Sequence, residues 1–97
     1  MELIFELIKE TYSTDPIGQK IPHETSRQVY GDKHSITRAE WNDAGQRGLK
    51  PEFMMTMFAY DYEGEELARV GGVKYSIYRT YRKDDTIELY MEKKAGN

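Results

Sequence analysis

The residues that could do chemistry in this chain are few and scattered. His23 and His34 stand eleven residues apart, and neither has a third ligand or a second histidine at metal-binding spacing. The carboxylates of Glu63, Glu65 and Glu66 cluster near a glycine, but they lack the Asp-rich spacing of a calcium loop. We therefore interpret the histidines as surface or loop residues and the carboxylates as a solvated turn.

Catalytic motifs and cysteine are absent from the sequence. A chain without cysteine has no disulfide, no thiolate metal ligand and no cysteine nucleophile. The phosphate-binding pattern G-x-x-x-x-G-K-[ST], the dinucleotide pattern G-x-G-x-x-G and the nucleophile pattern G-x-S-x-G are missing as well. The sequence therefore predicts a protein that is not an enzyme and that uses no metal or cofactor.

The charges are unevenly distributed along a chain whose net charge is −3. One segment carries five cations and no acid: Arg69, Lys74, Arg79, Arg82 and Lys83. Acidic residues flank it on both sides: Asp61, Glu63, Glu65, Glu66, Asp84, Asp85, Glu88 and Glu92. Two interpretations stay open, namely pairing across strands within one sheet and contact between a basic face of one copy and an acidic face of the next. For the second, the candidate interface residues are the five cations with Glu63, Glu65 and Glu66.

Length and composition indicate one soluble domain. The 97 residues have room for a single core. Eight tyrosines suit half-buried strands and also protein interfaces. No apolar run approaches the ~18 residues that span a bilayer, and the start lacks the pattern of a signal peptide. We expect a protein made in the cytoplasm, with no membrane partner.

Turn signals and alternating runs predict the strands. Between residues 67 and 93, Gly71-Gly72 and Lys83-Asp84-Asp85 separate three alternating runs, which is typical of an antiparallel meander. Three earlier strands are expected over residues 1–12, 25–36 and 53–62, although a short helix also fits the first. We expect a loop over 13–19, an edge position for Pro22 and a break or bulge at Gly31-Asp32. Both faces of the 53–62 strand should be covered at least in part, with its methionines filling the core.

One short helix is predicted at about residues 38–47. Thr37 and Glu40 match a capping box, in which Thr37 caps the first turn and Glu40 reaches back. Gly48 is the expected stop, and Trp41 is expected to anchor the helix in the core, with an exposed binding role as the alternative. The predicted fold is therefore mainly β, a small antiparallel β-barrel or sandwich of about six strands with this one helix.

The final hairpin allows a prediction of register. Ile77 and Tyr81 share one parity with Ile87 and Met91, so the apolar sets meet only across a loop of three or five residues. We expect Ile77 near Met91 and Tyr81 near Ile87. A two-residue loop would place Ile77 opposite Glu92. In the predicted register Arg79 is the one polar exception on the apolar face, and we expect it to reach the rim of that face or a partner.

Several segments, taken in order, carry a resemblance to a known family. They are Asp15-Pro16-Ile17-Gly18, residues 35–41, residues 44–52, residues 60–65, residues 72–81 and residues 85–90. Their order and spacing resemble those of the small phage head–tail joining proteins, also called head closure, head completion or stopper proteins. The resemblance covers nearly the whole chain and consists of turn and strand signatures.

The resemblance implies a structural role in the virion. It implies a non-enzymatic subunit that assembles as a ring at the head–tail joint of a phage or prophage, between portal or adaptor proteins and tail-completion proteins. A segment facing the channel would help to retain packaged DNA. By position this segment is Thr37 to Pro51, and its candidate contact residues are Arg38, Trp41, Gln46, Arg47 and Lys50. The alternative is an OB- or SH3-like module that binds nucleic acid or protein.

Overall fold

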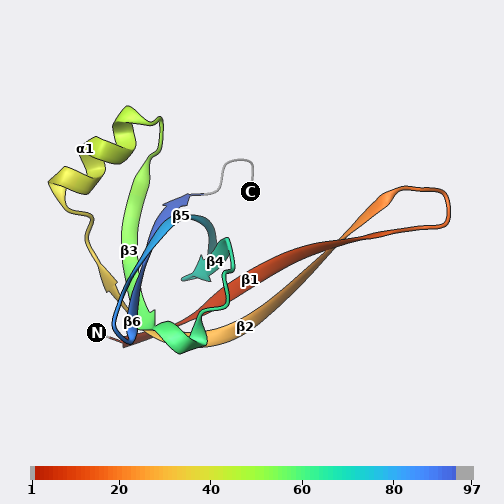
Figure 1. The fold of residues 1–97 in the computed structure, drawn as a ribbon, viewed down its shortest axis with the longest axis horizontal. Coiled ribbons are helices and arrows are strands. Elements are labelled where there is room, and N and C mark those ends of the chain that lie inside the picture. The colour runs from red at the N-terminus through yellow and green to blue at the C-terminus, as the bar shows by residue number, and fades with distance from the viewer. Residues whose placement is uncertain (1, 94–97) are drawn as a thin grey trace.

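Six antiparallel strands close on themselves, and one helix stands outside them (Figure 1). The computed structural model describes residues 2–93, so Met1 of the predicted first strand lies outside the described residues. The elements are β1 (Glu2–Thr14), β2 (Lys20–His34), α1 (Arg38–Gln46), β3 (Pro51–Phe58), the 3-10 turn η1 (Ala59–Asp61), β4 (Leu67–Val70), β5 (Val73–Lys83) and β6 (Thr86–Lys93). The order around the barrel is β1-β2-β3-β6-β5-β4, and β4 pairs with β1 to close it. The predicted β fold with six strands and one short helix is confirmed.

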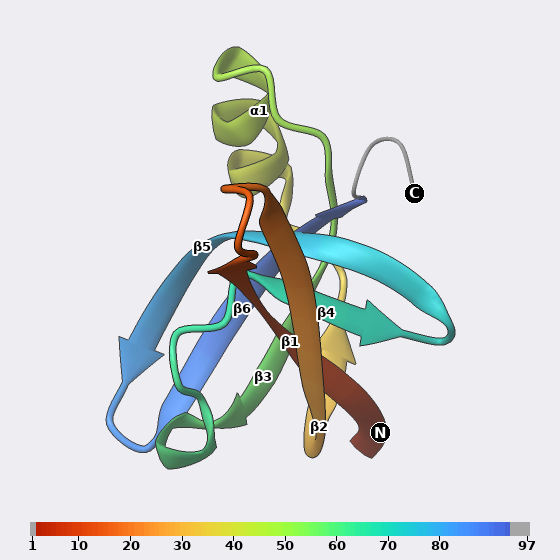
Figure 2. The same cartoon turned by 90° about the vertical axis from the view of Figure 1, so that its right-hand side faces the viewer.

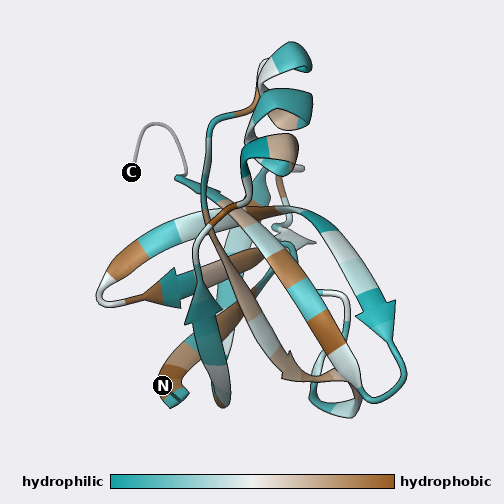
Figure 3. Cartoon of the chain, turned by 90° about the vertical axis from the view of Figure 1, so that its left-hand side faces the viewer, coloured by the Kyte–Doolittle hydropathy of each residue, from teal (hydrophilic) through white to brown (hydrophobic). Residues whose placement is uncertain are grey.

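One parity of each strand fills the barrel. Phe5, Leu7, Met55, Leu89 and Met91 are all at most 2 % exposed and belong to one cluster. Figure 3 shows the corresponding alternation of apolar and polar bands along the strands. Because side chains of a strand alternate between its faces, the same alternation that predicts the strands also places their apolar residues inside.

Strand β3 is buried on one face and partly covered on the other, where Met54 and Thr56 are half-buried, so the prediction of at least partial cover on both faces is confirmed. Pro51, Phe53, Met55 and Met57 are buried, whereas the alternate positions are half-buried or exposed. The strand also ends at Phe58, and the tyrosines that follow it lie in or beside η1. Two of its methionines fill the core as expected, and Met54 lies half-buried on the outer side.

Gly31 permits a close approach of strands and makes no bulge. Its pairing with Leu3 on one side and Met57 on the other continues in step with its neighbours, so the predicted break is wrong. A Cβ atom at this position would lie 2.3 Å from the carbonyl oxygen of Thr56 and 3.0 Å from the ring of Phe5. Only glycine fits here without displacing backbone.

In the last hairpin, a two-residue turn and a β-bulge together produce the predicted pairing of Ile77 with Met91. Lys83 pairs with Thr86, so the turn has two residues and the predicted loop of three or five is wrong. A β-bulge at Tyr78 restores the parity, because Ile77 pairs with Met91 while Arg79 pairs with Tyr90. The contact of Ile77 with Met91 is confirmed. Tyr81 pairs with Glu88 in place of Ile87, and Arg79 leaves the apolar face and points outward to α1.

Within residues 2–93, two parts of the chain project from the barrel (Figures 1 and 2). One is α1 with its flanking segments. The other is the far half of the β1–β2 hairpin, residues 9–25, which we call the arm. The first strand and the edge position of Pro22 are thus confirmed, since the arm strands pair with each other, whereas β4 and β3 pair with residues 6–8 and 31–34. No helix within residues 2–93 is long and apolar enough to cross a membrane.

Candidate functional site

Two of the predicted interface cations bind acids of their own chain at the base of the arm. Lys74 Nζ lies 2.8 Å from Glu24 Oε2, and the Arg69 guanidinium lies 3.5 Å from Glu24 and 3.4 Å from Glu6. The hydrogen bond from Lys74 holds the pKa of Glu24 below its ordinary value. This arrangement is the pairing within one sheet that the sequence left as one of two interpretations.

Glu65 is buried and hydrogen bonded within its own chain, so the prediction of a solvated turn is wrong for this residue. We call Glu65 and its hydrogen bonds the Glu65 latch. Its side chain is 5 % exposed and accepts hydrogen bonds from Arg27 Nε at 2.9 Å and from the backbone N–H of Glu63 at 2.9 Å. The Tyr62 hydroxyl donates to the Glu65 carbonyl at 2.6 Å. These bonds fix the segment between η1 and β4 against β2. The side chains of Glu63 and Glu66 are exposed.

The remaining predicted cations lie on two other parts of the barrel. Arg82 and Lys83 are exposed beside the β5–β6 turn, and the Arg82 guanidinium lies 4.8 Å from the centre of the Tyr60 ring. Arg79 faces the helix. The eight residues predicted as one interface are therefore divided among the arm base, the Glu65 latch, the β5–β6 turn and the helix.

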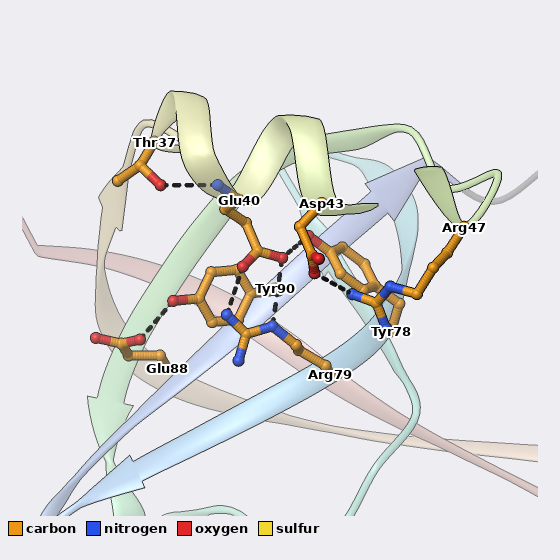
Figure 4. A network of polar contacts seen from close by, with 8 residues as sticks. All are labelled: Thr37, Glu40, Asp43, Arg47, Tyr78, Arg79, Glu88 and Tyr90. Carbon is orange, nitrogen blue, oxygen red and sulfur yellow. Dashed lines mark hydrogen bonds and ion pairs between the residues drawn. The ribbon is translucent and has the colours of Figure 1, made fainter. Parts of the chain in front are cut away.

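Arg79 holds α1 to the barrel through a cluster that we call the helix clamp, formed by Glu40, Tyr78, Arg79 and Tyr90 (Figure 4). Arg79 donates two hydrogen bonds to the Glu40 carboxylate, one from Nε at 3.3 Å and one from Nη2. The Tyr78 hydroxyl donates to Glu40 Oε2 at 2.8 Å, and the guanidinium lies 4.0 Å from the centre of the Tyr90 ring. A carboxylate that is nine-tenths buried thus has three donated bonds to compensate for its burial.

The clamp shifts the protonation equilibria of its members. The bonds from Arg79, and then from Tyr78, hold the pKa of Glu40 below its ordinary value of 4.5, against the opposing effect of burial. Burial and the bond to Glu40 raise the pKa of Tyr78. Burial and the bond to Glu88 raise the pKa of Tyr90 to about 12. At neutral pH the cluster is a carboxylate held by neutral tyrosines and one guanidinium.

The ends of α1 follow the predicted signals with one difference. Thr37 accepts from the backbone N–H of Glu40 at 3.2 Å, as the capping box requires. The Glu40 side chain crosses to β5, so the predicted return bond to the cap is wrong. At the other end, Leu49 N–H donates to the carbonyl of Ala44 and Gly48 N–H to that of Gly45, with Gly48 at φ +79°. This Schellman motif confirms Gly48 as the stop.

Trp41 lies on the outside of the helix, so the prediction of a core anchor is wrong. The buried residues of α1 are Glu40 and Ala44, one turn apart, whereas Trp41 is 58 % exposed. A residue that follows Glu40 directly is rotated by about 100° from it. The clamp therefore orients the helix, and the tryptophan faces solvent. The other candidate contact residues, Arg38, Gln46, Arg47 and Lys50, are exposed as well.

The arm is an exposed ribbon with a well-defined turn. Every residue from Lys9 to Ser26 is exposed except Asp15, which is half-buried. Asp15 Oδ1 accepts from the backbone N–H groups of Ile17 at 3.1 Å and Gln19 at 2.8 Å, and Gly18 takes φ +88°. The prediction ended the first strand at residue 12 and began the next at 25. It therefore missed the paired strands of the arm, although it placed the turn between them correctly within residues 13–19.

A shallow depression, which we call the hollow, lies at the opposite end of the same ribbon. Ile4 pairs with Tyr30 on the outer face of β1 and β2. Because Gly31 pairs with Met57 in antiparallel strands, the preceding Tyr30 lies beside Phe58, which follows Met57. All three side chains are at least half exposed, and the Phe58 ring lies 5.2 Å from that of Tyr60. Carboxyl-bearing residues line the hollow next to these rings: Glu2, Asp32, Asp61 and Asp85.

The histidines lie on the surface, as predicted. His23 Nε2 and Ser13 Oγ are hydrogen bonded at 2.8 Å within the arm, and His34 Nε2 lies 3.0 Å from Thr56 Oγ1. Among residues 2–93 no group of three His, Asp or Glu side chains is close enough to hold a metal ion.

Comparison with known proteins matches no family model, no curated protein and no solved structure.

Proposed function

We propose that this chain is a structural subunit of the head–tail joint of a tailed phage or prophage, where copies assemble as a ring that connects or closes the DNA-filled head. The proposal assigns it no catalytic reaction. Its direct neighbours would be portal or adaptor proteins on one side and tail-completion proteins on the other. The protein would be made in the bacterial cytoplasm and reside in the virion, where packaged DNA passes it without sequence-specific contact.

The observation that carries the proposal is the arm. Residues 9–25 form a two-stranded ribbon without a core of its own, and such ribbons are marginal in water. At the other end of the same ribbon, the barrel exposes several large apolar side chains close together. A subunit with two such unlike surfaces suits head-to-tail contact with further copies, which is the contact that builds rings. A small β-barrel with one short helix also agrees with what the family resemblance implies for the fold.

The alternative of a nucleic-acid-binding module has less support. Three of the five cations in residues 69–83 bind carboxylates of the same chain, namely Arg69, Lys74 and Arg79. Cations that are neutralised in this way release few counterions from a nucleic acid. A gel shift with single-stranded DNA at low and physiological salt tests this alternative, and tight binding that weakens steeply with salt would favour it.

The test of the proposed function is a phage or lysogen in which this gene carries an early stop codon. We expect lysates with DNA-filled heads and separate tails by electron microscopy, and recovery of infectious particles when purified protein is added. Gold-labelled antibody against the tagged protein should mark the head–tail joint. Normal infectious yields without the protein, or a gene with no portal, capsid or tail genes around it, would refute the proposal.

A further inference from the structure

The tip of the arm, residues 16–22, is an apolar wedge that carries one charge. Ile17 is 79 % exposed, and Ile21 and the adjacent Tyr12 are exposed as well. Lys20 is the one ionisable residue of this heptapeptide. The carboxylate of the preceding Asp15 is engaged by two backbone N–H groups of the turn. The tip therefore presents a fixed shape with exposed aliphatic side chains and a single cation.

The hollow has the complementary character. Tyr30 and Phe58 line it, Ile4 pairs with Tyr30 and the Tyr60 ring lies against that of Phe58, so four large apolar side chains that are at least half exposed gather at this end of the barrel. Carboxylates of Glu2, Asp61 and Asp85 stand beside these rings and are exposed. One cation also lies here, since the Arg82 guanidinium is 4.8 Å from the centre of the Tyr60 ring, but the three carboxylates outnumber it. An apolar surface with an excess of negative charge favours an apolar partner with a positive charge.

The tip of a molecule cannot reach its own hollow. β1 begins at Glu2 beside the hollow and ends at Thr14 beside the tip, and the 13 residues between these ends span roughly 40 Å of extended strand. The longest dimension is 49 Å, and Figure 1 shows the start of β1 and the arm turn at opposite ends. A tip that enters such a hollow therefore belongs to another copy.

We propose that the tip of the arm of one copy docks in the hollow of a second copy of this chain, with Lys20 placed among the carboxylates and Ile17 on the aromatic rings. The contact joins unlike surfaces, so each copy offers one tip and one hollow, and successive copies form a ring or a chain. This docking deepens the proposed function. Only one part of it rests on that function, namely that the repeated contact closes into the ring of the head–tail joint.

Single cysteines test the contact, because the chain has none of its own. Gln19→Cys places a thiol on the tip, and Thr86→Cys places one at the edge of the hollow without removing an aromatic ring. The two variants, distinguished by a mass tag, are mixed at about 1 mM and oxidised. Random collisions give as much disulfide-linked heterodimer as the two homodimers together. The proposed contact should give about five times as much heterodimer as the two homodimers together. Equal shares would overturn the inference.

Matched variants keep the test specific. Gln19→Cys mixed with Gln46→Cys, an exposed position on the helix, should give equal shares. Lys20→Glu in the tip variant should abolish the excess, and Lys20→Arg should keep it; an excess that survives Lys20→Glu contradicts the charge pairing. Equal shares together with gold label at the head–tail joint would refute the docking alone. An excess without any phage phenotype would leave the docking and refute the proposed function.

Discussion

The arm and the helix both project from the barrel, but the chain fixes them to very different degrees. The helix is held by a buried carboxylate with three donated hydrogen bonds and by Ala44, whose side chain is fully buried. The arm extends from its base at Glu24 with exposed residues on both faces. One projection is therefore oriented by its own chain before any partner binds, whereas the other has apolar surface that only a partner can cover.

This difference separates stability from assembly within one small domain. Contacts of the helix clamp stabilise the folded monomer, because they replace water around groups that folding buries. Side chains at the arm tip contribute little to the stability of the monomer, because they remain exposed in the folded state. Mutations in the helix clamp should therefore lower the stability of the monomer, whereas mutations in the arm should impair assembly and leave that stability nearly unchanged.

The largest expected effect on stability is that of Glu40→Ala. It removes the acceptor of Arg79 and Tyr78 and leaves their donors without a partner in a half-buried site, so we expect the free energy of unfolding to fall by about 2 kcal/mol. Urea denaturation followed by circular dichroism measures this change. Asp43→Ala is the matched control, since Asp43 forms an exposed ion pair with Arg47 and should matter by less than about 0.5 kcal/mol. Equal effects of the two substitutions would contradict the clamp.

Thr37→Ala should have a smaller effect on the same element. It removes the side-chain oxygen that accepts from Glu40 N–H, and a lost helix cap of this kind costs about 1 kcal/mol. Thr37→Ser retains the oxygen and should change the free energy of unfolding by a few tenths of a kcal/mol. Denaturation curves of the two variants test the cap, and a Ser variant as unstable as the Ala variant would argue against it.

Acid should release the helix before it unfolds the barrel. The pKa of Glu40 is lower in the folded protein than the value of 4.5 that it has in an unfolded chain. Its contribution to stability is therefore present above pH 4.5 and is lost as the pH falls through the lower, folded pKa. The fluorescence of Trp41, the single tryptophan, reports on the helix during this titration. Glu40→Gln should remove this part of the pH dependence, and an unchanged titration would show that another group is responsible.

The sequence allowed the correct prediction of features that depend on a few neighbouring residues. Thr37 and Gly48 predict both ends of α1, Gly71-Gly72 predicts the tight turn between β4 and β5, and alternation predicts the core of each strand. These signals act over one or two turns of chain. They were enough to identify the fold class, because each strand carries its own pattern.

The errors arose where contacts between distant residues decide the outcome. Trp41 faces solvent because Glu40 binds Arg79, a residue 39 positions away. The bulge at Tyr78 exists because a two-residue turn would otherwise put Ile77 on the wrong side of the barrel. The length of the arm was missed because strands that bury nothing carry no apolar periodicity that could be recognised.

Shortening the arm should have the smallest effect on stability and should abolish assembly. Replacing residues 11–23 by Asn-Gly would close the hairpin between Glu10 and Glu24 with a two-residue turn and keep the carboxylate that binds Arg69 and Lys74. Because the removed residues are exposed, we expect the free energy of unfolding to change by less than about 1 kcal/mol. The shortened chain should nevertheless fail to restore infectious particles to a phage lacking the gene. Asp43→Ala, a substitution in the helix that should also change stability little, should restore them. Loss of folding on shortening would show that the arm stabilises the monomer after all, and normal rescue would show that its surface needs no partner.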